Sequence, residues 1–208
     1  MSGVYDIGDD TFFDNINRLP AAHIMTLDLK KGCFEQPKRY WNPSVNEKFS
    51  GSKNEATEII REKFLKNIKF HLRSDVPIGI ALSGGIDSSS IACSVRYLEN
   101  KIPITTFSYI ADENSISEET WIDKVNQKIN SIPQKVFLDP EDISKDLDSL
   151  ILAQGEPFGT TSIYAQFKIF RVMKDCGITV ALEGQGADEM FGGYQGYPAE
   201  RLQSLFDN

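Results

Sequence analysis

A short glycine- and serine-rich segment, residues 83–89, has the residue types of a turn that binds phosphate groups. Gly84 and Gly85 let the backbone approach an anion without Cβ atoms in the way, and the serines add short hydroxyl donors. Asp87 would repel an anion unless a divalent cation lay between its carboxylate and the phosphates. The segment therefore predicts a site for a Mg²⁺-nucleotide complex. The alternative is an ordinary Ser/Gly turn that binds nothing.

The residues on either side of this turn place it at the start of a helix. Residues 77–82 form an apolar run that is typical of a buried strand, and residues 88–99 have the apolar spacing of a helix. A helix N-terminus offers free backbone N–H groups and the positive end of the helix dipole, both of which stabilise an anion. No Gly-Lys-Ser/Thr follows the glycines, so the turn is not a Walker A loop, which disfavours a P-loop-like kinase.

A second glycine-rich segment, residues 183–194, follows the apolar run 178–182 and contains Asp188. Its four glycines predict a loop and not a helix. The carboxyl ends of parallel strands meet at one edge of a sheet, where ligands bind. Asp87 and Asp188 are therefore expected to hold one Mg²⁺ between them, over the polyphosphate of a nucleotide. The alternative for Asp188 is a solvated turn.

Strand and helix patterns alternate along most of the chain. After a helix at 55–73, with Asn54 as its N-cap and Ile60, Phe64, Ile68 and Leu72 on one face, strands are predicted at 77–82, 104–110, 135–138 and 178–182, and helices at 88–99, 118–129, 140–154 and 162–176. Expected helix boundaries are a capping box of Ser115 with Glu118, an N-cap at Asp139 and a terminating Gly177. This order predicts an α/β fold with a doubly wound, mostly parallel sheet.

The N-terminal part of the chain has a different pattern. Residues 1–42 contain two partly alternating runs around a turn at 30–32, which predicts a β-hairpin. Residues 43–54 are polar, which predicts a linker. The main domain is therefore expected over 55–208.

Composition limits the class of protein. With 208 residues, 40% of them hydrophobic, the chain can bury one ordinary core and a smaller appendage. The net charge of -8 and the scattered Lys and Arg residues disfavour a nucleic acid partner, and no apolar run is long enough to span a membrane. The three cysteines are far apart, which favours reduced thiols over disulfides or zinc. We expect a cytoplasmic protein with small-molecule substrates.

Two of these segments resemble signatures of one family. Residues 83–89 resemble the PP-loop of the N-type ATP pyrophosphatases, and residues 184–194 resemble the second signature of the asparagine synthetase (glutamine-hydrolysing) family. Residues 156–159 and 11–41 also resemble parts of that family, the latter the end of its glutaminase domain. The resemblance implies an adenine nucleotide alpha hydrolase-like fold. It also implies that residues 1–42 are a remnant of the glutaminase domain and that the synthetase domain is C-terminally truncated.

The family activates the β-carboxylate of aspartate with ATP and Mg²⁺, and ammonia from glutamine then gives asparagine, AMP and pyrophosphate. By position, the resemblance implies that the nucleotide site is formed by Ala81, Leu82, Ser83, Gly84, Gly85, Asp87, Ser88, Ser89, Ser108, Tyr109, Glu183 and Gly184. Among these, Ser108 and Tyr109 match a backbone contact to adenine, and Glu183 and Gly184 match backbone contacts to the nucleotide. Asp87 and Asp188 match the Mg²⁺ ligands, and both are expected to be catalytic together with Gln185.

Three departures from the family pattern are visible. Many members have Glu where this chain has Gln185, and an amide cannot act as a base, so a carboxylate other than aspartate stays open. The cysteine nucleophile of the glutaminase domain and a later lysine of the synthetase domain have no match in the chain. The isolated chain is therefore expected to be inactive. Its apolar docking face is expected to be exposed, which predicts self-association.

Other functional interpretations remain open beside that of an asparagine synthetase. One is a paralogous PP-loop amidotransferase acting on another carboxylate, such as a β-lactam or sugar-directed amide synthetase. A tRNA thiolase or lysidine synthetase is disfavoured by the acidic charge and by the second signature. Another is a non-catalytic module that binds a nucleotide, or that serves only in assembly.

Overall fold

The computed structural model describes residues 8–44, 48–111 and 118–206. Its internal contacts divide the chain into two units. The first unit contains the residues up to Ala56 together with Asp148–Gly159, and the second contains Thr57–Leu147 and the residues from Thr160 onward. Every residue of the candidate site described below belongs to the second unit.

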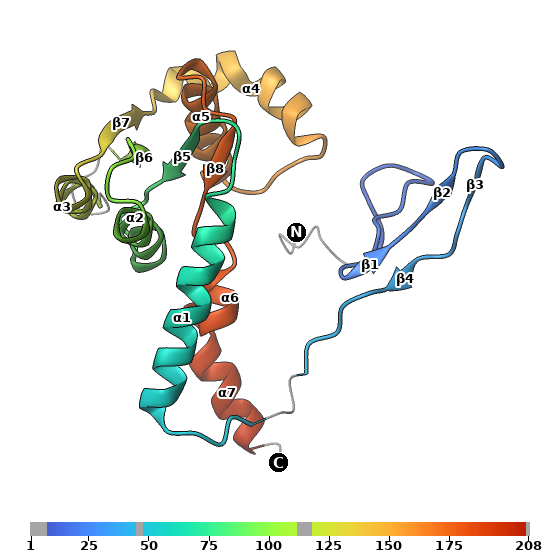
Figure 1. Ribbon diagram of the computed structural model, residues 1–208. Helices are drawn as coiled ribbons and strands as arrows, with labels where there is room; N and C mark the ends of the chain where they lie inside the picture. Colours follow the sequence, from blue (N-terminus) through green and yellow to red (C-terminus); the bar gives the residue numbers. More distant parts are fainter. Residues whose placement is uncertain (1–7, 45–47, 112–117, 207–208) are drawn as a thin grey trace. The chain divides into compact units, whose positions relative to one another are not determined.

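Four parallel strands form the sheet of the second unit, in the order β7-β6-β5-β8 (Figure 1). The strands are β5 (Ile78–Ala81), β6 (Thr105–Ile110), β7 (Ile132–Phe137) and β8 (Val180–Leu182). The chain runs from β5 outward through β6 to β7 and then returns to place β8 on the other side of β5. The strand order therefore reverses between β5 and β8. In parallel sheets, ligands bind outside the carboxyl ends of the strands at such a reversal.

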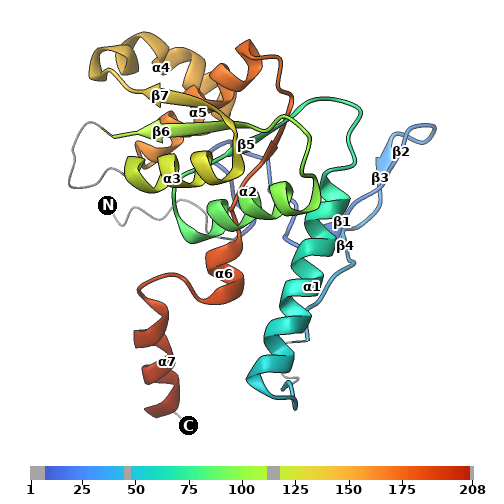
Figure 2. The same cartoon turned by 60° about the vertical axis from the view of Figure 1, so that its left-hand side comes forward.

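Helices cover both faces of this sheet. The helices α2 (Ile86–Leu98) and α3 (Glu119–Ile129) pack on each other and contact β5 and β6, whereas α5 (Ser162–Asp175) contacts β6 and β7. Figure 2 shows α2 and α3 on one face and α5 on the other. The doubly wound parallel sheet expected from the sequence is therefore confirmed. The hydrophobic core contains Ile80, Leu82, Ile91, Ala92, Val95, Ile104, Ile110, Ile122, Ile129 and Leu182, joined by Ile68 of α1 (Lys53–His71).

The start of α1 differs from the prediction. The helix begins before Asn54, which therefore lies inside it and is not the N-cap. Ser52 takes that place, because its backbone N–H donates to Glu55 Oε2 (2.6 Å) and its hydroxyl accepts from the Glu55 N–H (3.3 Å). This reciprocal pair is a capping box. A Ser three residues before a Glu gives a better cap than Asn, and the helix starts accordingly.

The predicted apolar face of α1 is only partly used. Ile68 is buried, and Phe64 and Leu72 pack against the core cluster. Ile60, one helical turn before Phe64, is 48% exposed, so the core does not cover this end of the face. The part of α1 that contacts the core therefore lies in its C-terminal half.

The strand β7 is longer than the predicted 135–138. All six of its residues pair with β6, from Ile132 opposite Thr105 to Phe137 opposite Ile110. Pro133 lies within this strand. Proline lacks an N–H donor but is tolerated in a strand at the edge of a sheet, which is where β7 lies.

The remaining helices of the chain are α4 (Pro140–Gln154), α6 (Ala187–Phe191) and α7 (Tyr197–Phe206). The short helix α6 corrects the prediction of a continuous loop over 183–194. Gly186 and Gly192 stand at its two ends with φ of 88° and 69°. Both conformations are left-handed and favour glycine, so two of the four glycines bound a helical turn and do not prevent it.

Two predicted helix boundaries are confirmed. Asp139 Oδ1 accepts a hydrogen bond from the Glu141 N–H (2.9 Å) at the start of α4. Gly177 ends the helix α5 with a φ of 73°. The predicted partner of Glu118, Ser115, lies outside the described residues.

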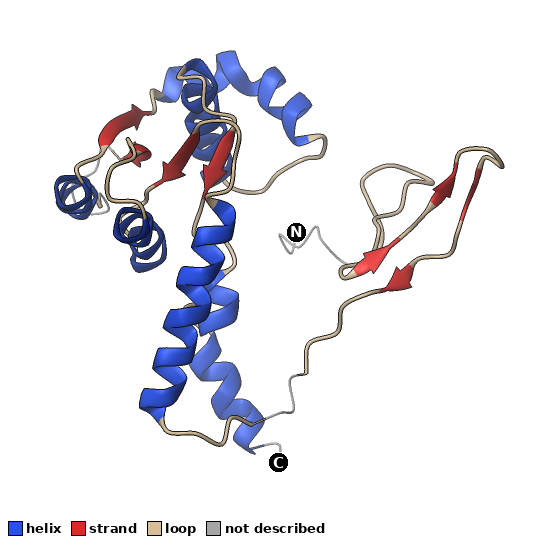
Figure 3. Ribbon diagram, in the orientation of Figure 1, coloured by secondary structure: helices blue, strands red, loops and turns tan. Residues whose placement is uncertain are grey.

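The first unit contains the expected β-hairpin, as two short antiparallel ladders (Figure 3). In these ladders β1 (His23–Ile24) pairs with β4 (Lys38–Arg39), and β2 (Leu27–Asp28) pairs with β3 (Cys33–Phe34). Gly32 closes the turn with a φ of 63°, and its N–H donates to Asp28 O (2.8 Å). Residues 25–26 lie opposite residues 35–37, so one strand carries an extra residue and the ladder is interrupted.

No helix in the part of the chain that the structure describes is both long enough and apolar enough to cross a membrane.

An aspartate of α4, Asp146, connects this helix to α5. Asp146 accepts hydrogen bonds from Tyr164 Oη (2.9 Å), from Lys168 Nζ (3.1 Å) and from Arg171 Nη1. Burial raises the pKa of Asp146, but the hydrogen bonds from Lys168, Tyr164 and Arg171 outweigh burial and lower it from 3.8 to about 2.

This shift predicts a pH dependence of stability. Because the folded pKa of Asp146 is depressed, its contribution is complete above pH 3.8 and is lost as the pH falls toward about 2. The full contribution is about 2 kcal/mol. Denaturant titrations at pH 5 and pH 2.5 should show a smaller loss of unfolding free energy on acidification for Asp146→Asn than for the wild type. Asp148→Asn, an exposed neighbour on α4, should behave like the wild type. Equal losses in all three proteins would contradict this assignment.

Candidate nucleotide site

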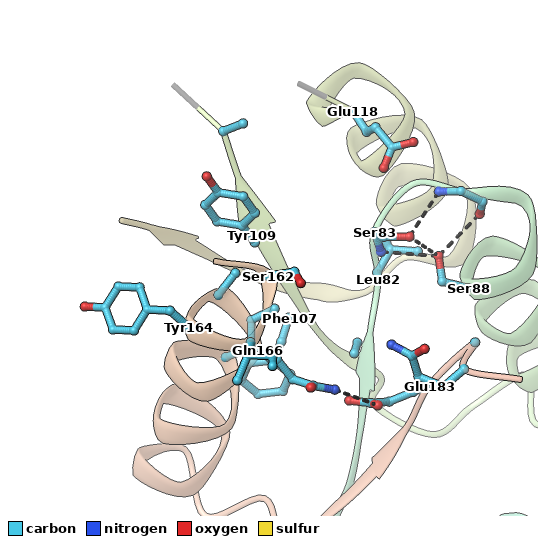
Figure 4. Close-up of a pocket in the computed structure, with 18 of the residues that line it drawn as sticks. Leu82, Ser83, Ser88, Phe107, Tyr109, Glu118, Ser162, Tyr164, Gln166 and Glu183 are labelled. Atoms are coloured by element: carbon cyan, nitrogen blue, oxygen red, sulfur yellow. Dashed lines mark hydrogen bonds between the residues drawn. The ribbon is translucent and has the colours of Figure 1, made fainter. Parts of the chain in front are cut away.

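A cavity of about 880 Å³ opens at the carboxyl ends of the strands, lined by residues of the strand ends and of α5 (Figure 4). Most of the predicted site residues line it: Ala81, Leu82, Ser83, Gly85, Asp87, Ser88, Tyr109, Glu183, Gly184, Gln185 and Asp188. The residues of the first glycine-rich segment follow β5, Tyr109 lies on β6, and the residues of the second segment follow β8. The cavity therefore lies where the strand order reverses.

Serine hydroxyls close the turn after β5. Ser83 Oγ and Ser88 Oγ are hydrogen-bonded (3.0 Å), and the Ser83 N–H donates to Ser88 Oγ (3.2 Å). The Gly85 N–H donates to Ser83 Oγ (3.3 Å), and Gly85 is the N-cap residue of α2. Because glycine has no side chain, no N-cap side chain occupies the first-turn N–H groups of α2. These groups are the donors that an anion at this helix end would use.

The two glycine-rich segments contact each other through Gly184. A Cβ atom at Gly184 would lie 3.2 Å from Asp87 Cβ and 3.2 Å from Ser88 N. The loop after β8 is therefore packed directly on the first turn of α2. Gly193 has a similar role at Asp188, because any side chain there would collide with the Asp188 carboxylate.

Three predicted site residues are not among those lining the cavity: Gly84, Ser89 and Ser108. Gly84 has a φ of +89°, and a Cβ there would lie 3.1 Å from Glu118 O, so it packs against the start of α3. The hydroxyls of Ser89 and Ser108 are buried without a hydrogen-bond partner among the described residues. The binding roles of these three residues stay predictions, and the structure explains Gly84 by its left-handed backbone.

The charge of the cavity is negative. Four carboxylates line it, namely Asp87, Glu118, Glu183 and Asp188, and the described lining residues include no Lys, Arg or His. A polyphosphate would be repelled here unless cations accompanied it. Mg²⁺ uses one or two protein carboxylates and completes its shell with phosphate oxygens and water. Asp87 and Asp188 fit this donor set. No group of three or more His, Cys, Asp or Glu that could hold a metal by itself occurs among the described residues.

Sequence reasoning missed the side-chain environment of Glu183. Its carboxylate reaches into the cavity, where Gln166 Nε2 of α5 donates to Glu183 Oε2 (3.3 Å; Figure 4). Burial raises the pKa of the Glu183 carboxyl, and the hydrogen bond from Gln166 partly opposes the rise. Gln166 gives no signal in the sequence, because a polar residue on an amphipathic helix is usually solvated.

The fold and the cavity together define a doubly wound α/β protein with a glycine-rich, PP-loop-type turn at the point where the strand order reverses. The family model for Asparagine synthase matches residues 59–207. The chain therefore belongs to the asparagine synthase family.

Relatives cover most of the chain. It is 29% identical to the putative asparagine synthetase [glutamine-hydrolyzing] 2 of Methanocaldococcus jannaschii, over 94% of this chain and 38% of that protein. It is 28% identical to the amidase chyE of Penicillium rubens, over 92% of this chain and 31% of that protein. The chain thus spans about a third of the length of these relatives. A solved NH3-dependent NAD synthetase from Campylobacter jejuni is similar with a TM-score of 0.42 and 17% identity, over 70% of this chain and 62% of that one.

Proposed function

We propose that the chain is the Mg²⁺·ATP-binding part of an enzyme that forms an amide from a carboxylate and ammonia. In the proposed reaction a carboxylate oxygen attacks the α-phosphorus of ATP and displaces pyrophosphate. Ammonia then attacks the acyl carbon and displaces AMP. Aspartate is the proposed carboxylate, and asparagine is the product. The observation that carries this proposal is the contact of Gly184 with the first turn of α2, because it unites the two glycine-rich segments in one cavity.

The residues of the turn after β5 hold the pyrophosphate part of ATP in this proposal. The first-turn N–H groups of α2 and the hydroxyls of Ser83 and Ser88 are the donors. Asp87 and Asp188 hold Mg²⁺, which would neutralise the negative charge that develops on the leaving pyrophosphate. Ala81, Leu82 and Tyr109 lie along the nucleotide, and the proposed backbone contact to adenine comes from Ser108 and Tyr109. The contribution of these residues is positioning and electrostatic stabilisation.

A second candidate is amide formation on a carboxylate other than aspartate. Gln185 favours it, because this cavity-lining residue carries an amide and cannot act as a base. In either case the proposed ammonia source is a glutaminase domain beyond this chain.

We place the protein in the cytoplasm, where its three free cysteines stay reduced. We also propose that it self-associates.

Competition between ligands tests the adenylation site. If the turn after β5 holds the pyrophosphate part of ATP, then Mg²⁺·pyrophosphate and AMP should each displace a fluorescent ATP analogue from the chain. Mg²⁺·GTP should compete at least about tenfold less well, because the adenine contact is lost. Bound ATP analogue that neither pyrophosphate nor AMP displaces would contradict the proposed function. The assay needs no turnover, so it does not depend on a supply of ammonia.

A further inference from the structure

Glu183 is an unpaired carboxylate in the wall of the cavity. Its side chain is half-buried, and Oε2 accepts one hydrogen bond, from Gln166 Nε2 at 3.3 Å. Glu183 Oε1 accepts no hydrogen bond from the described residues. Figure 4 shows the two side chains meeting from α5 and from the end of β8. The described residues that line the cavity include no cationic side chain that could pair with Glu183.

This arrangement is unfavourable without a ligand. A carboxylate that loses water on burial needs hydrogen bonds or a cation in its place, and one neutral amide replaces only part of the lost hydration. The raised pKa of the Glu183 carboxyl has burial as its cause and reports the same deficit. A ligand that brings a cation to Oε1 would remove the deficit.

The chemistry of the cavity limits which part of the bound ligands can meet Glu183. Phosphate groups would be repelled by its charge, and the proposed Mg²⁺ ligands are two other carboxylates, Asp87 and Asp188. Ribose hydroxyls are donors, but they are neutral and leave the charge uncompensated. An ammonium group both donates and compensates the charge, and charge-assisted bonds are the stronger ones.

The geometry points to a specificity role that rests on the proposed function. We propose that Glu183, oriented by Gln166, binds the ammonium group of the substrate whose carboxylate is activated. The site would then select amino acids and other amine-bearing carboxylic acids over carboxylic acids that lack an amine. Glu183 is the residue that touches the substrate, and Gln166 is a positioning residue.

Matched pairs of acids test the inference. The full chain is saturated with Mg²⁺ and α,β-methylene ATP, which does not react, and is then titrated with aspartate or succinate, and with glutamate or glutarate. Each pair differs only in the amine. Of aspartate and glutamate, the wild type will bind one more tightly. It should bind that amino acid at least about tenfold more tightly than its amine-free counterpart, as expected for one charge-assisted contact. Glu183→Gln should abolish this preference. The contact expected between Glu183 and the nucleotide is made by the backbone, which the substitution keeps, so the nucleotide affinity of the variant should stay within about twofold of the wild type.

Two further variants separate the roles. Glu200→Gln makes the same charge change at an exposed position on α7 and should keep the preference. Gln166→Leu should reduce the preference and leave nucleotide affinity unchanged, because it releases Glu183 without removing its charge. The inference is overturned if the wild type shows no preference for the amine-bearing acid, or if Glu183→Gln retains that preference. It is also overturned if Glu183→Gln mainly weakens nucleotide binding, which would place the Glu183 side chain at the ribose. A folded wild type that binds no Mg²⁺·nucleotide overturns the proposed function itself, and this inference with it.

Discussion

Asp87→Asn is expected to weaken the binding of Mg²⁺·ATP by about a hundredfold, or about 2.8 kcal/mol. Asparagine keeps the shape of the side chain at the first turn of α2 but removes one of the two proposed Mg²⁺ ligands. The described lining residues offer no Lys, Arg or His to take over the neutralisation of the phosphates. The loss should therefore fall on the cation-dependent part of binding. Isothermal titration calorimetry at a fixed excess of Mg²⁺ measures it.

Omitting the metal sharpens this experiment. With EDTA present, Asp87→Asn should bind ATP no more weakly than the wild type, because the substitution removes a repulsive charge. Asp175→Asn, an exposed change of the same kind at the end of α5, should match the wild type in both conditions. An unaltered Mg²⁺·ATP affinity in a folded Asp87→Asn protein would remove Asp87 from the cation site.

Gly184→Ala should separate the two glycine-rich segments. The new Cβ would lie 3.2 Å from Asp87 Cβ and from Ser88 N, and backbone atoms of a helix cannot turn away. We expect the loop after β8 to move off α2, with a loss of about 1–3 kcal/mol in unfolding free energy, as for an overpacked contact. Asp188 comes four residues after Gly184, so its carboxylate should be displaced together with the loop. The affinity for Mg²⁺·ATP should therefore fall by roughly tenfold or more.

Gly196→Ala is the matched control for this prediction. A Cβ at Gly196 meets no atom within 4 Å, and its backbone is not left-handed. It should therefore keep both the stability and the nucleotide affinity of the wild type. If Gly184→Ala behaved like Gly196→Ala in thermal melting and in calorimetry, the contact between the two segments would not support the site.

The strands and the first glycine turn could be predicted because their signals are local. An apolar run followed by Ser-Gly-Gly and a helical spacing leaves little choice for residues 77–99, and β5 and α2 lie within that range. The parallel order of the sheet follows from the alternation of strands and helices. The closeness of Asp87 and Gly184 follows in turn, because both come directly after strands of the same sheet.

The features that were missed depend on contacts between distant residues. The length of β7 depends on its place at the sheet edge, which allows Pro133 inside a strand. The helix α6 depends on where left-handed glycines fall, and their number alone does not reveal it. The pairing of Gln166 with Glu183 joins residues 17 positions apart, and no sequence pattern marks Gln166 as the partner of Glu183. Residues 148–159 group with the N-terminal unit, where Arg18 and Glu156 form an ion pair of 3.4 Å.

Titration of ATP into the wild-type chain, with Mg²⁺ and then with EDTA, shows whether the cavity is a Mg²⁺-dependent nucleotide site. We expect saturable binding at one site when Mg²⁺ is present, and at least about tenfold weaker binding without it, because four carboxylates line the cavity. Circular dichroism on the same sample shows that the chain is folded. A folded chain that binds no ATP, or that binds it equally well without Mg²⁺, would rule out a Mg²⁺·ATP site in this cavity.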